Sequence, residues 1–441
     1  MLNIQFGEFA PRARDICAAI EAPPEFSSWL CFASANDVNQ LPLLKRLWGN
    51  NVSEPLLKAS QLVNMCKKDT KFGGEGRYIV IKTSPIAGVS ASFAQALANQ
   101  DPSATVRMFV THRKAYAVWS LQNDLIERTQ GNANAVLEAL KSEVDSARYA
   151  HARMMARFAN GHGGGTVGQF AAAVNVATNT FTFRTETDVL GLEPGMKIWL
   201  STADGSAATA SVAADVRGAG ANSLTIATIS GYTVTTTALI NTIPGATAND
   251  WVSVAGNYAA AMTGLRGYLP DTAPTAGDNF MGLDRSTTYV NRVAGYHVAG
   301  NGQPKLQTLE DAAAEGAMRN LSGEMVLVCN PRTIRDIRKE LGSEVIIEEV
   351  LDVKVGFKAI KILLQTGTAT LLSEPDAPTA TSRLMRMSDF WLRSTDTIPK
   401  DITGAGGKLL VDYQDDARQG RLGAYGNFFH EEPGECIIIT W

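Results

Sequence analysis

Two glycine-rich segments are the first places in the sequence where chemistry could be expected. His162, Gly163, Gly164 and Gly165 follow the pattern of the loop whose backbone N–H groups bind an oxyanion in lipases and esterases. That reaction needs a serine in a G-x-S-x-G turn, and the sequence contains no such turn. Because the four residues follow a predicted helix and not a strand, we interpret them as a flexible hinge at the helix end.

A second glycine-rich segment, GAGGK at residues 404–408, is similar to a phosphate-binding loop. Ile402 replaces the first glycine of that motif, and Leu409 stands where the motif has a serine or threonine. We therefore predict a turn here and no bound nucleotide.

Histidines and cysteines form no metal or redox motif in the sequence. His112, His297 and His430 are isolated, and no H-E-x-x-H pattern, EF-hand spacing or Cys/His grouping is present. The five cysteines are widely spread without a C-x-x-C pair, which is typical of reduced cytoplasmic thiols. We predict no catalytic residue, no cofactor, no metal and no enzymatic activity, although folding could join distant carboxylates.

Charged residues gather at two places that could contact another protein. The first set lies on two predicted strands and consists of Arg77, Lys82, Arg107, Arg113 and Lys114. The second set consists of Asp412, Asp415, Asp416, Arg418 and Arg421. Its members could form ion pairs across a subunit boundary, and the alternative of a solvated surface stays open.

Composition excludes several classes of protein. Of the 441 residues, 45% are hydrophobic and 19% are charged, which is ordinary for a folded chain of roughly three modules. A net charge of −4 has the wrong sign for a protein that grips nucleic acid along its length. The first residues carry no signal-peptide pattern and no apolar run approaches ~18 residues, so we expect a cytoplasm-like compartment.

Residues 73–120 are predicted to form a long hairpin. KFGGEGRYIVIK gives a turn and a strand, a polar, alanine-rich stretch follows, and ATVRMFVTHRKAYAVWSL shows the alternation of a second strand. A two-stranded ribbon is marginal alone, and a connection of ~20 residues is long for a compact domain. The ribbon therefore needs a partner surface, either on another molecule or on its own domain.

The clearest predicted element is a helix at residues 132–160. Its apolar face consists of Val136, Leu140, Val144, Ala147, His151, Met154 and Phe158. Asn132 or Asn134 can cap its start and Gly161 can end it, giving a rod of roughly 40 Å. We interpret His151 on this face as a packed core residue.

Between residues 166 and 260 the composition shifts to Ala, Thr, Ser, Gly and Val. The strand-like pieces TFTFRT, MKIWLS, SLTIATI, YTVTTT and DWVSV are separated by turn residues at 193–195, 204–205 and 244–245. Their regular spacing favours a small all-β insertion over a disordered, threonine-rich stalk.

Residues 300–400 alternate helix and strand in the manner of an α/β or α+β domain. Thr308 to Asp311 are similar to a capping box for a helix that ends near Leu321. Asn330 and Pro331 supply the cap and the first-turn proline of RTIRDIRKEL, which ends at Gly342. Strands are predicted at EMVLVC, FKAIKILLQ, TATLLSE and RLMRMSDFWLRS, with further extended segments in the tail.

The order of these features resembles the major capsid proteins of tailed double-stranded-DNA bacteriophages, which have the Hong Kong 97 phage capsid fold. HRKAYAVWSLQNDLIERT resembles the return of that family's extended loop (E-loop), and residues 132–160 resemble its spine helix. GLRGYLPD and LDRSTTYVNRVAG resemble its connecting loops. VLVCNPRTIRDIRKELG resembles its axial strand–helix unit and GRLGAYGNFFHEEPGECIIIT its terminal strand.

The resemblance implies an α+β fold in seven parts. They are an N-terminal arm (1–70), the E-loop hairpin (71–120), a peripheral domain with the spine helix (121–169), an inserted β-rich domain (170–260), connecting loops and strands (261–300), an axial domain (301–400) and C-terminal return strands (401–441). The β-rich part departs from the family's minimal pattern and resembles insertions that some members carry.

The resemblance also implies a function, that of a coat protein whose pentamers and hexamers form an icosahedral shell around packaged double-stranded DNA. Implied partners are further copies, a portal, a possible decoration protein and DNA in weak non-specific contact, without a membrane. The N-terminus lacks a long charged helix of the built-in scaffold kind, so a separate scaffolding protein is expected. Such a shell is assembled in the host bacterial cytoplasm and becomes part of the virion, and the two charged sets are the expected assembly contacts.

Two alternatives stay open at this point. One is an encapsulin-like compartment, which shares the fold and encloses cargo enzymes. The other is a cytoplasmic α/β enzyme that uses residues 300–400, in which the hairpin packs within its own molecule.

Overall fold

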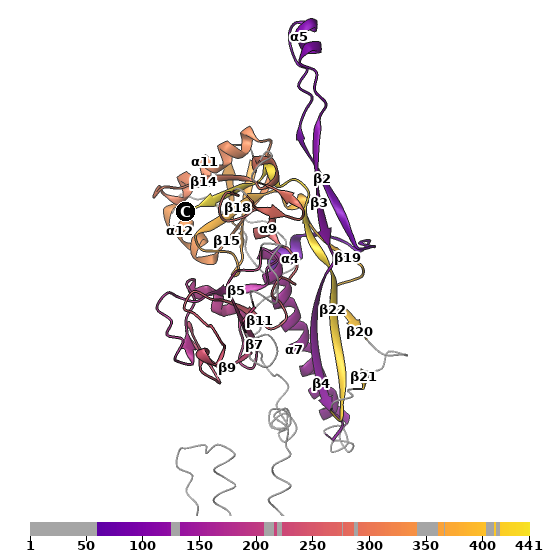
Figure 1. Ribbon diagram of the computed structural model, residues 1–441, viewed down its shortest axis with the longest axis vertical. Helices are drawn as coiled ribbons and strands as arrows, with labels where there is room; N and C mark the ends of the chain where they lie inside the picture. Colours follow the sequence, from indigo (N-terminus) through magenta and orange to yellow (C-terminus); the bar gives the residue numbers. More distant parts are fainter. Residues whose placement is uncertain are drawn as a thin grey trace, which may run out of the picture. The chain divides into compact units, whose positions relative to one another are not determined.

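The structure of the chain, a computed structural model, describes residues 60–124, 133–206, 216–217, 223–275, 277–285, 290–341, 360–365, 367–402, 410–411 and 415–441 (Figure 1). The chain divides into two compact units, a larger one of residues 56–118, 146–403 and 421–441 and a smaller one of residues 1–55, 119–145 and 404–420. In the described part of the chain, no helix is long and apolar enough to cross a membrane. The predicted arm before residue 60, the GAGGK turn and Gly342 lie outside the described residues.

The larger unit contains a mixed six-stranded sheet in the order β14–β23–β18–β15–β17–β16. Its strands are β14 (Tyr296–Ala299), β15 (Gly323–Cys329), β16 (Ile360–Leu364), β17 (Gly367–Ser373), β18 (Thr381–Met385) and β23 (Ile437–Thr440). β14 pairs with β23 in parallel, as β15 does with β17, and the other neighbours are antiparallel. Helices α11 (Lys305–Met318) and α12 (Pro331–Leu341) contribute Leu309, Ala313 and Ile337 to the core of this sheet.

The two predicted helix starts in this region differ in outcome. α12 begins at Pro331, and the Asn330 side chain accepts a 3.0 Å hydrogen bond from the backbone N–H of Arg332, which confirms the predicted cap. The prediction that a capping box starts the helix at Thr308 is wrong, because α11 already begins at Lys305. Thr308 lies inside the helix, where its hydroxyl donates to the carbonyl oxygen of Pro304.

A second sheet is arranged around the long strand β22 (Ala417–His430). Its partners are β19 (Phe390–Ser394), β20 (Lys400–Ile402), β21 (Leu410–Val411) and β4 (Arg113–Gln122), and β1 (Lys67–Asp69) pairs in parallel with β19. The prediction of RLMRMSDFWLRS as one strand is therefore wrong. Its first part belongs to β18 and its last part to β19 in the other sheet, with the 3-10 turn η4 (Met387–Asp389) between them. Apolar runs indicate burial and do not indicate the sheet to which each part belongs.

Helix α7 spans Ala133–Asn160 and confirms the predicted long helix. On its predicted apolar face, Ala147, His151 and Phe158 are buried. Gly161 follows the helix and its backbone N–H donates to the carbonyl oxygen of Phe158, as expected for a helix end. His151 is a packed core residue, as predicted.

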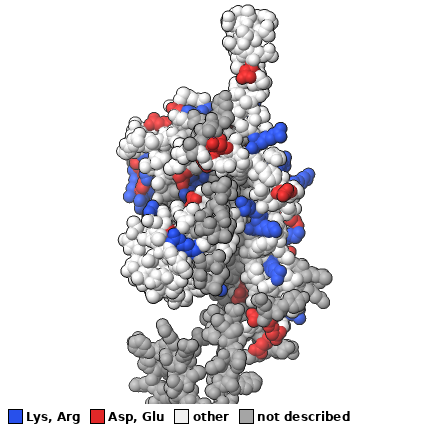
Figure 2. All heavy atoms as spheres, in the orientation of Figure 1, with Lys and Arg blue, Asp and Glu red and all other residues white. Residues whose placement is uncertain are grey.

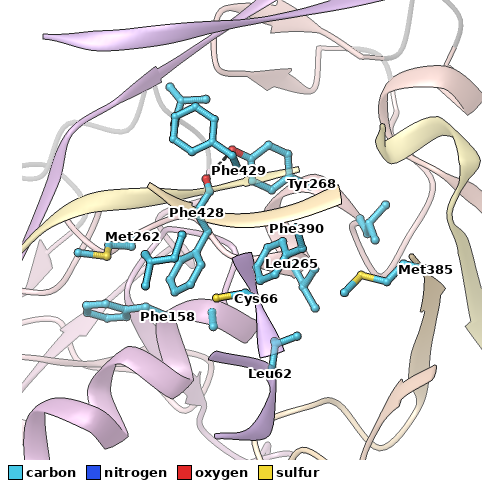
Figure 3. Packing of buried hydrophobic residues seen from close by; sticks show 14 of the residues in the cluster. Leu62, Cys66, Phe158, Met262, Leu265, Tyr268, Met385, Phe390, Phe428 and Phe429 are labelled. Carbon is cyan, nitrogen blue, oxygen red and sulfur yellow. Dashed lines mark hydrogen bonds between the residues drawn. The ribbon is translucent and has the colours of Figure 1, made fainter. Parts of the chain in front are cut away.

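The C-terminal end of α7 lies in the main core of the larger unit. Figure 3 shows side chains from α4 (Gln61–Met65), α7, α9 (Leu265–Tyr268), β18, β19 and β22 converging there. In this core the hydroxyl of Tyr268 donates a 2.8 Å hydrogen bond to the carbonyl oxygen of Phe428. One apolar core, with its buried hydroxyl satisfied, therefore joins segments that are distant in the sequence.

Residues 166–254 contain a seven-stranded sheet with a core of its own. Its strands are β5 (Thr166–Gln169), β6 (Thr180–Phe181), β7 (Lys197–Ser201), β8 (Val216–Arg217), β9 (Leu224–Ser230), β10 (Thr233–Thr236) and β11 (Trp251–Val254), and the 3-10 turns η1 (Glu186–Gly191) and η3 (Ile240–Thr242) lie between them. All five predicted strand pieces contain a strand. Gly195, Gly205 and Gly245 have positive φ, which explains the glycine at each predicted turn. That this sheet is an insertion in the capsid family stays a prediction.

Candidate self-association surface

Strands β2 (Gly76–Ser84) and β3 (Ala104–Thr111) form an antiparallel ribbon, and α5 (Phe93–Ala98) lies in their connection (Figure 1). The ribbon is shorter than predicted, because its second arm ends at Thr111 and the chain continues after His112 as β4, which pairs with β22. The His112 ring stacks on Phe72 with centroids 3.8 Å apart. The predicted hairpin over residues 73–120 is therefore two elements that meet at a packed histidine.

The inner face of the ribbon packs on its own unit. Ile79, Ile81, Met108 and Val110 are buried and belong to the main core. The backbone N–H of Phe109 donates a 3.1 Å hydrogen bond to the carbonyl oxygen of Met281, in the turn between β12 (Asn279–Phe280) and β13 (Leu283–Asp284). One face of the ribbon thus has its partner within the same chain.

The opposite face of the ribbon is exposed. Its cross-strand pairs are Tyr78 with Phe109, Val80 with Arg107 and Lys82 with Thr105, and we call these six residues the outer ribbon face. The rings of Tyr78 and Phe109 lie 4.9 Å apart, and Tyr78 and Val80 are each 59% exposed. Aromatic and aliphatic side chains beside a cationic Arg are typical of protein interfaces.

The connection between β2 and β3 carries a second exposed apolar set, which we call the ribbon tip (residues 84–103). Phe93 is 82% exposed and Leu97, one helical turn later, is 59% exposed. Asp101 is the only charged residue of the tip, and Figure 2 shows this end of the molecule almost free of blue and red atoms. Describing the stretch as polar and alanine-rich missed this set, although the spacing of four between Phe93 and Leu97 was a signal.

The basic residues predicted as contacts have different environments. Arg77, Lys82, Arg107 and Lys114 are exposed. Arg113 is half-buried, and its guanidinium donates a 2.9 Å hydrogen bond to the carbonyl oxygen of Ala259. Burial lowers the pKa of Arg113. The first four side chains are therefore accessible to another molecule, whereas Arg113 makes a contact within its own unit.

The second predicted set is only partly described. Asp412 lies outside the described residues, and Asp415, Arg418 and Arg421 are exposed. Asp416, in the smaller unit, accepts a 2.5 Å hydrogen bond from the side-chain amide of Asn123 and a 3.0 Å hydrogen bond from its backbone N–H. A role of this set in assembly stays a prediction.

Burial lowers the pKa of all five histidines, which are His112, His151, His162, His297 and His430. The prediction that His430 is isolated is wrong, since its Nε2 lies 3.4 Å from Cys436 Sγ. A nucleophilic Cys–His pair needs a thiolate and an imidazolium. Here burial raises the pKa of the Cys436 thiol and lowers that of His430 to about 4, so both groups are neutral at pH 7. No group of three metal-binding side chains occurs in the described ranges.

The glycine-rich segment after α7 is a closely packed joint. The backbone N–H of Gly164 donates a 3.1 Å hydrogen bond to His162 Nδ1, and its carbonyl oxygen accepts one from the N–H of Ala259. A Cβ on Gly165 would lie 1.9 Å from the carbonyl oxygen of Asn257. Glycine is needed here for close backbone approach, which corrects the expectation of a flexible hinge. The Gly164 N–H is also occupied, so it is not available to an oxyanion.

The arrangement of helices and sheets is similar to a solved structure described as the cyanophage A-1(L) capsid asymmetric unit. The likeness has a TM-score of 0.53 at 10% sequence identity and covers 92% of this chain and 98% of that chain. The fold is that of a phage capsid protein. The similarity of the folds confirms the resemblance to phage capsid proteins that was inferred from the order of features in the sequence.

Two further capsid structures are similar at lower scores. They are the capsid of a native GTA particle (TM-score 0.43, 10% identity, 93% of this chain and 99% of that chain) and the major capsid proteins of phage G with their decoration proteins (TM-score 0.41, 8% identity, 90% and 95%). No protein-family model and no curated protein matches the sequence. At 10% identity, the likeness to the cyanophage capsid shows the fold alone.

Proposed function

We propose that the chain is a coat protein whose copies form the pentamers and hexamers of an icosahedral shell around packaged double-stranded DNA. The observation that supports this most is the division of the ribbon into a face buried in its own unit and an outer face and tip that are exposed. Exposed large apolar side chains gathered on one element in this way are typical of an interaction site. The capsid fold favours a second copy of the chain as the partner.

Assembly of such a shell requires no catalysis. Each contact can be modest, because closed rings repeat one interface and multiply weak interactions. Burial of Phe93 and Leu97 supplies apolar contact area, and the exposed cations Lys82 and Arg107 select acidic surfaces on the neighbour. A net charge of −4 suits a shell that must not bind its packed genome tightly.

The same proposal includes further partners and a location. The shell is part of the virion and is assembled in the host bacterial cytoplasm with a portal, a separate scaffolding protein and, where present, a decoration protein. The four exposed basic residues of the first set and Asp412, Asp415, Arg418 and Arg421 of the second set are the proposed assembly contacts, together with the apolar ribbon tip.

Negative-stain microscopy and sedimentation velocity of the full-length chain test the proposal. The chain is expressed alone and together with the genes that neighbour its own. Hollow polyhedral particles or sheets of capsomers are the expected result. A discrete dimer that stays soluble at every concentration contradicts the proposal.

The double variant Phe93→Ser, Leu97→Ser tests the ribbon tip. Both side chains are exposed in the single chain, so circular dichroism and thermal unfolding should match those of the parent. Particle yield should fall about tenfold or more, because the lost contact is repeated in every subunit. Met318→Ser, at a residue 72% exposed in α11, removes a comparable apolar side chain and should leave the yield unchanged. Parental yield from the double variant excludes the tip as a contact.

A further inference from the structure

A buried carboxyl group in the larger unit ties together three segments that are distant in the sequence. Glu374 follows β17 and is fully buried. Its oxygens accept hydrogen bonds from the Ser60 hydroxyl at 2.6 and 2.8 Å, from the Leu62 backbone N–H at 3.3 Å and from the Asn160 side-chain amide at 3.3 Å. Ser60 also caps α4, because its hydroxyl oxygen accepts from the N–H of Val63. Glu374 therefore joins the start of α4 to the end of α7.

The arginines in the last turns of α7 make their contacts with other groups than this carboxyl. α4 contributes no charged side chain. From α7, Arg153 pairs with Asp376 at 2.6 Å, and Arg157 donates a 2.6 Å hydrogen bond to the carbonyl oxygen of Gly191. Asp188 of η1 interacts with Arg157 and with Asp376. Glu374 is thus held by neutral donors, and the charged group that acts on its pKa is the carboxylate of Asp376.

This environment raises the pKa of Glu374 toward neutral pH. Burial raises the pKa of the carboxyl to about 7, the Asp376 carboxylate acts in the same direction, and the three hydrogen-bond donors oppose it. On β15, the thiol of Cys329 stays neutral, because burial raises its pKa to about 12. Asp188, which like Glu374 is influenced by Asp376, also titrates in this range, since burial raises its pKa to about 7.

We propose that protonation of Glu374 controls how firmly residues 60–66 are held against the end of α7. The neutral carboxyl remains in the interior with its hydrogen bonds. The ionised carboxyl is stabilised when residues 60–66 move away and water reaches it. This inference goes beyond the proposed shell and does not depend on it.

Proton linkage gives the direction of the effect. In the closed state the pKa of Glu374 is about 7, and when the site opens it returns toward its ordinary value of 4.5. Because the closed state binds more protons between these values, opening becomes easier as pH rises from 4.5 to 7 and levels off above 7. The ratio of open to closed molecules should increase ~30-fold between pH 5 and pH 7.

Hydrogen exchange of the full chain measures this opening. The backbone amides of Leu62, Asn64 and Cys66 donate to Glu374, to Ser60 and to Leu62, so their protection reports the closed state. Protection factors, which remove the pH dependence of intrinsic exchange, are compared at pH 5, 6 and 7, with the amides of β15 as an internal reference. The factors for residues 60–66 should fall ~30-fold over this range, while those of β15 stay constant. Constant protection of residues 60–66 in the parent overturns the proposal.

Two variants separate the effect of Glu374 from that of Asp188, the other carboxyl with a pKa of about 7. In Glu374→Gln the side chain keeps its size and one acceptor oxygen but cannot ionise. Protection of the amides of residues 60–66 should therefore no longer depend on pH. Asp188→Asn removes the other carboxyl whose pKa lies near 7 and should leave the pH dependence of residues 60–66 as in the parent. If Glu374→Gln retains the parental dependence, or if Asp188→Asn removes it, Glu374 is not the controlling group. Should Glu374→Gln not fold, the exchange of the parent and of Asp188→Asn still decides the question.

Discussion

Arg383 Nη2 lies 2.5 Å from Asp271 Oδ1, and this ion pair fastens the loop after α9 to β18. The Arg383 side chain is almost fully buried, and it also donates a 3.0 Å hydrogen bond to the carbonyl oxygen of Leu269. Arg266 and Thr381 donate to the same carboxylate. Burial raises the pKa of Asp271, but these partners lower it by more, and Arg383 has the largest effect among them. The pKa of Asp271 is therefore held well below its usual range. The carboxylate is therefore the centre of a satisfied buried network.

Asp271→Ala should lower the free energy of unfolding by about 3 kcal/mol, because the variant leaves the Arg383 guanidinium buried without its counter-ion. Urea unfolding at pH 7, followed by circular dichroism, measures the change. Asp396→Ala removes a surface carboxylate that pairs with Lys400, and its effect should be too small to measure. Equal midpoints for Asp271→Ala and the parent contradict the prediction.

The same carboxylate should make stability depend on pH. Since the pKa of Asp271 is lowered on folding, its contribution to the free energy of unfolding is present above pH 3.8 and is lost as pH falls below that value.

His430 should make the fold sensitive to acid. Burial lowers its pKa from 6.5 to about 4, so the unfolded chain takes up a proton at a higher pH than the folded chain does. His430 should therefore contribute about 3 kcal/mol to the fall in the free energy of unfolding as pH decreases from 6.5 to 4, beside His162, whose pKa is also lowered by burial to about 4. In His430→Gln this part of the pH dependence should be absent, as measured by urea unfolding at pH 7 and pH 4.5. His297→Gln, at a less buried histidine, should retain most of the parental slope. A parental slope in His430→Gln shows that another group dominates.

Elements that one local pattern determines were predictable from the sequence. Helix α7 was predicted at residues 132–160 and lies at Ala133–Asn160, because apolar residues repeat at the helical spacing over its whole length. The start of α12 was predictable because Asn330 and Pro331 act on the backbone next to them. Five of the seven strands in the sheet formed by β5–β11 were predicted, because strand-like pieces alternate with turns, three of which contain a glycine with positive φ; β5 and β8 were not predicted.

Features that depend on packing between distant segments were not predictable. RLMRMSDFWLRS mixes apolar residues and arginines in both of its strands, and this pattern does not show that two sheets share the segment. β3 ends and β4 begins on either side of His112, whose ring stacks on Phe72, a contact that the sequence pattern does not indicate. The Glu374 cluster needs Ser60 and Asn160, which only the fold brings together. For the candidate surface, the contact role of the basic residues stays a prediction, and the apolar tip was missed because its six-residue helix offers only one pair, Phe93 and Leu97, at helical spacing.

Charge reversal on the outer ribbon face should block self-association without unfolding the chain. Lys82 and Arg107 are exposed, so Lys82→Glu with Arg107→Glu should preserve the circular dichroism spectrum and the unfolding midpoint. Particle yield should fall about tenfold or more, since acidic partners on a neighbour would now be repelled. The matched control is Lys197→Glu with Lys339→Glu, which places the same charge change on exposed residues of β7 and α12. Equal loss of yield in both double variants would attribute the effect to net charge and not to the ribbon.

Gly420 should tolerate no side chain, because β22 passes directly against the indole ring of Trp119 in the smaller unit. A Cβ at residue 420 would lie 2.2 Å from ring atoms of Trp119. Gly420→Ala should therefore lower the free energy of unfolding by about 1–3 kcal/mol, because the indole ring or the strand must shift to make room for the methyl group. At Gly73 no heavy atom lies within 4 Å of the added Cβ, so Gly73→Ala controls for the change in backbone freedom. Urea unfolding of both variants makes the comparison, and equal stability of the two would mean that β22 and Trp119 can separate at little cost.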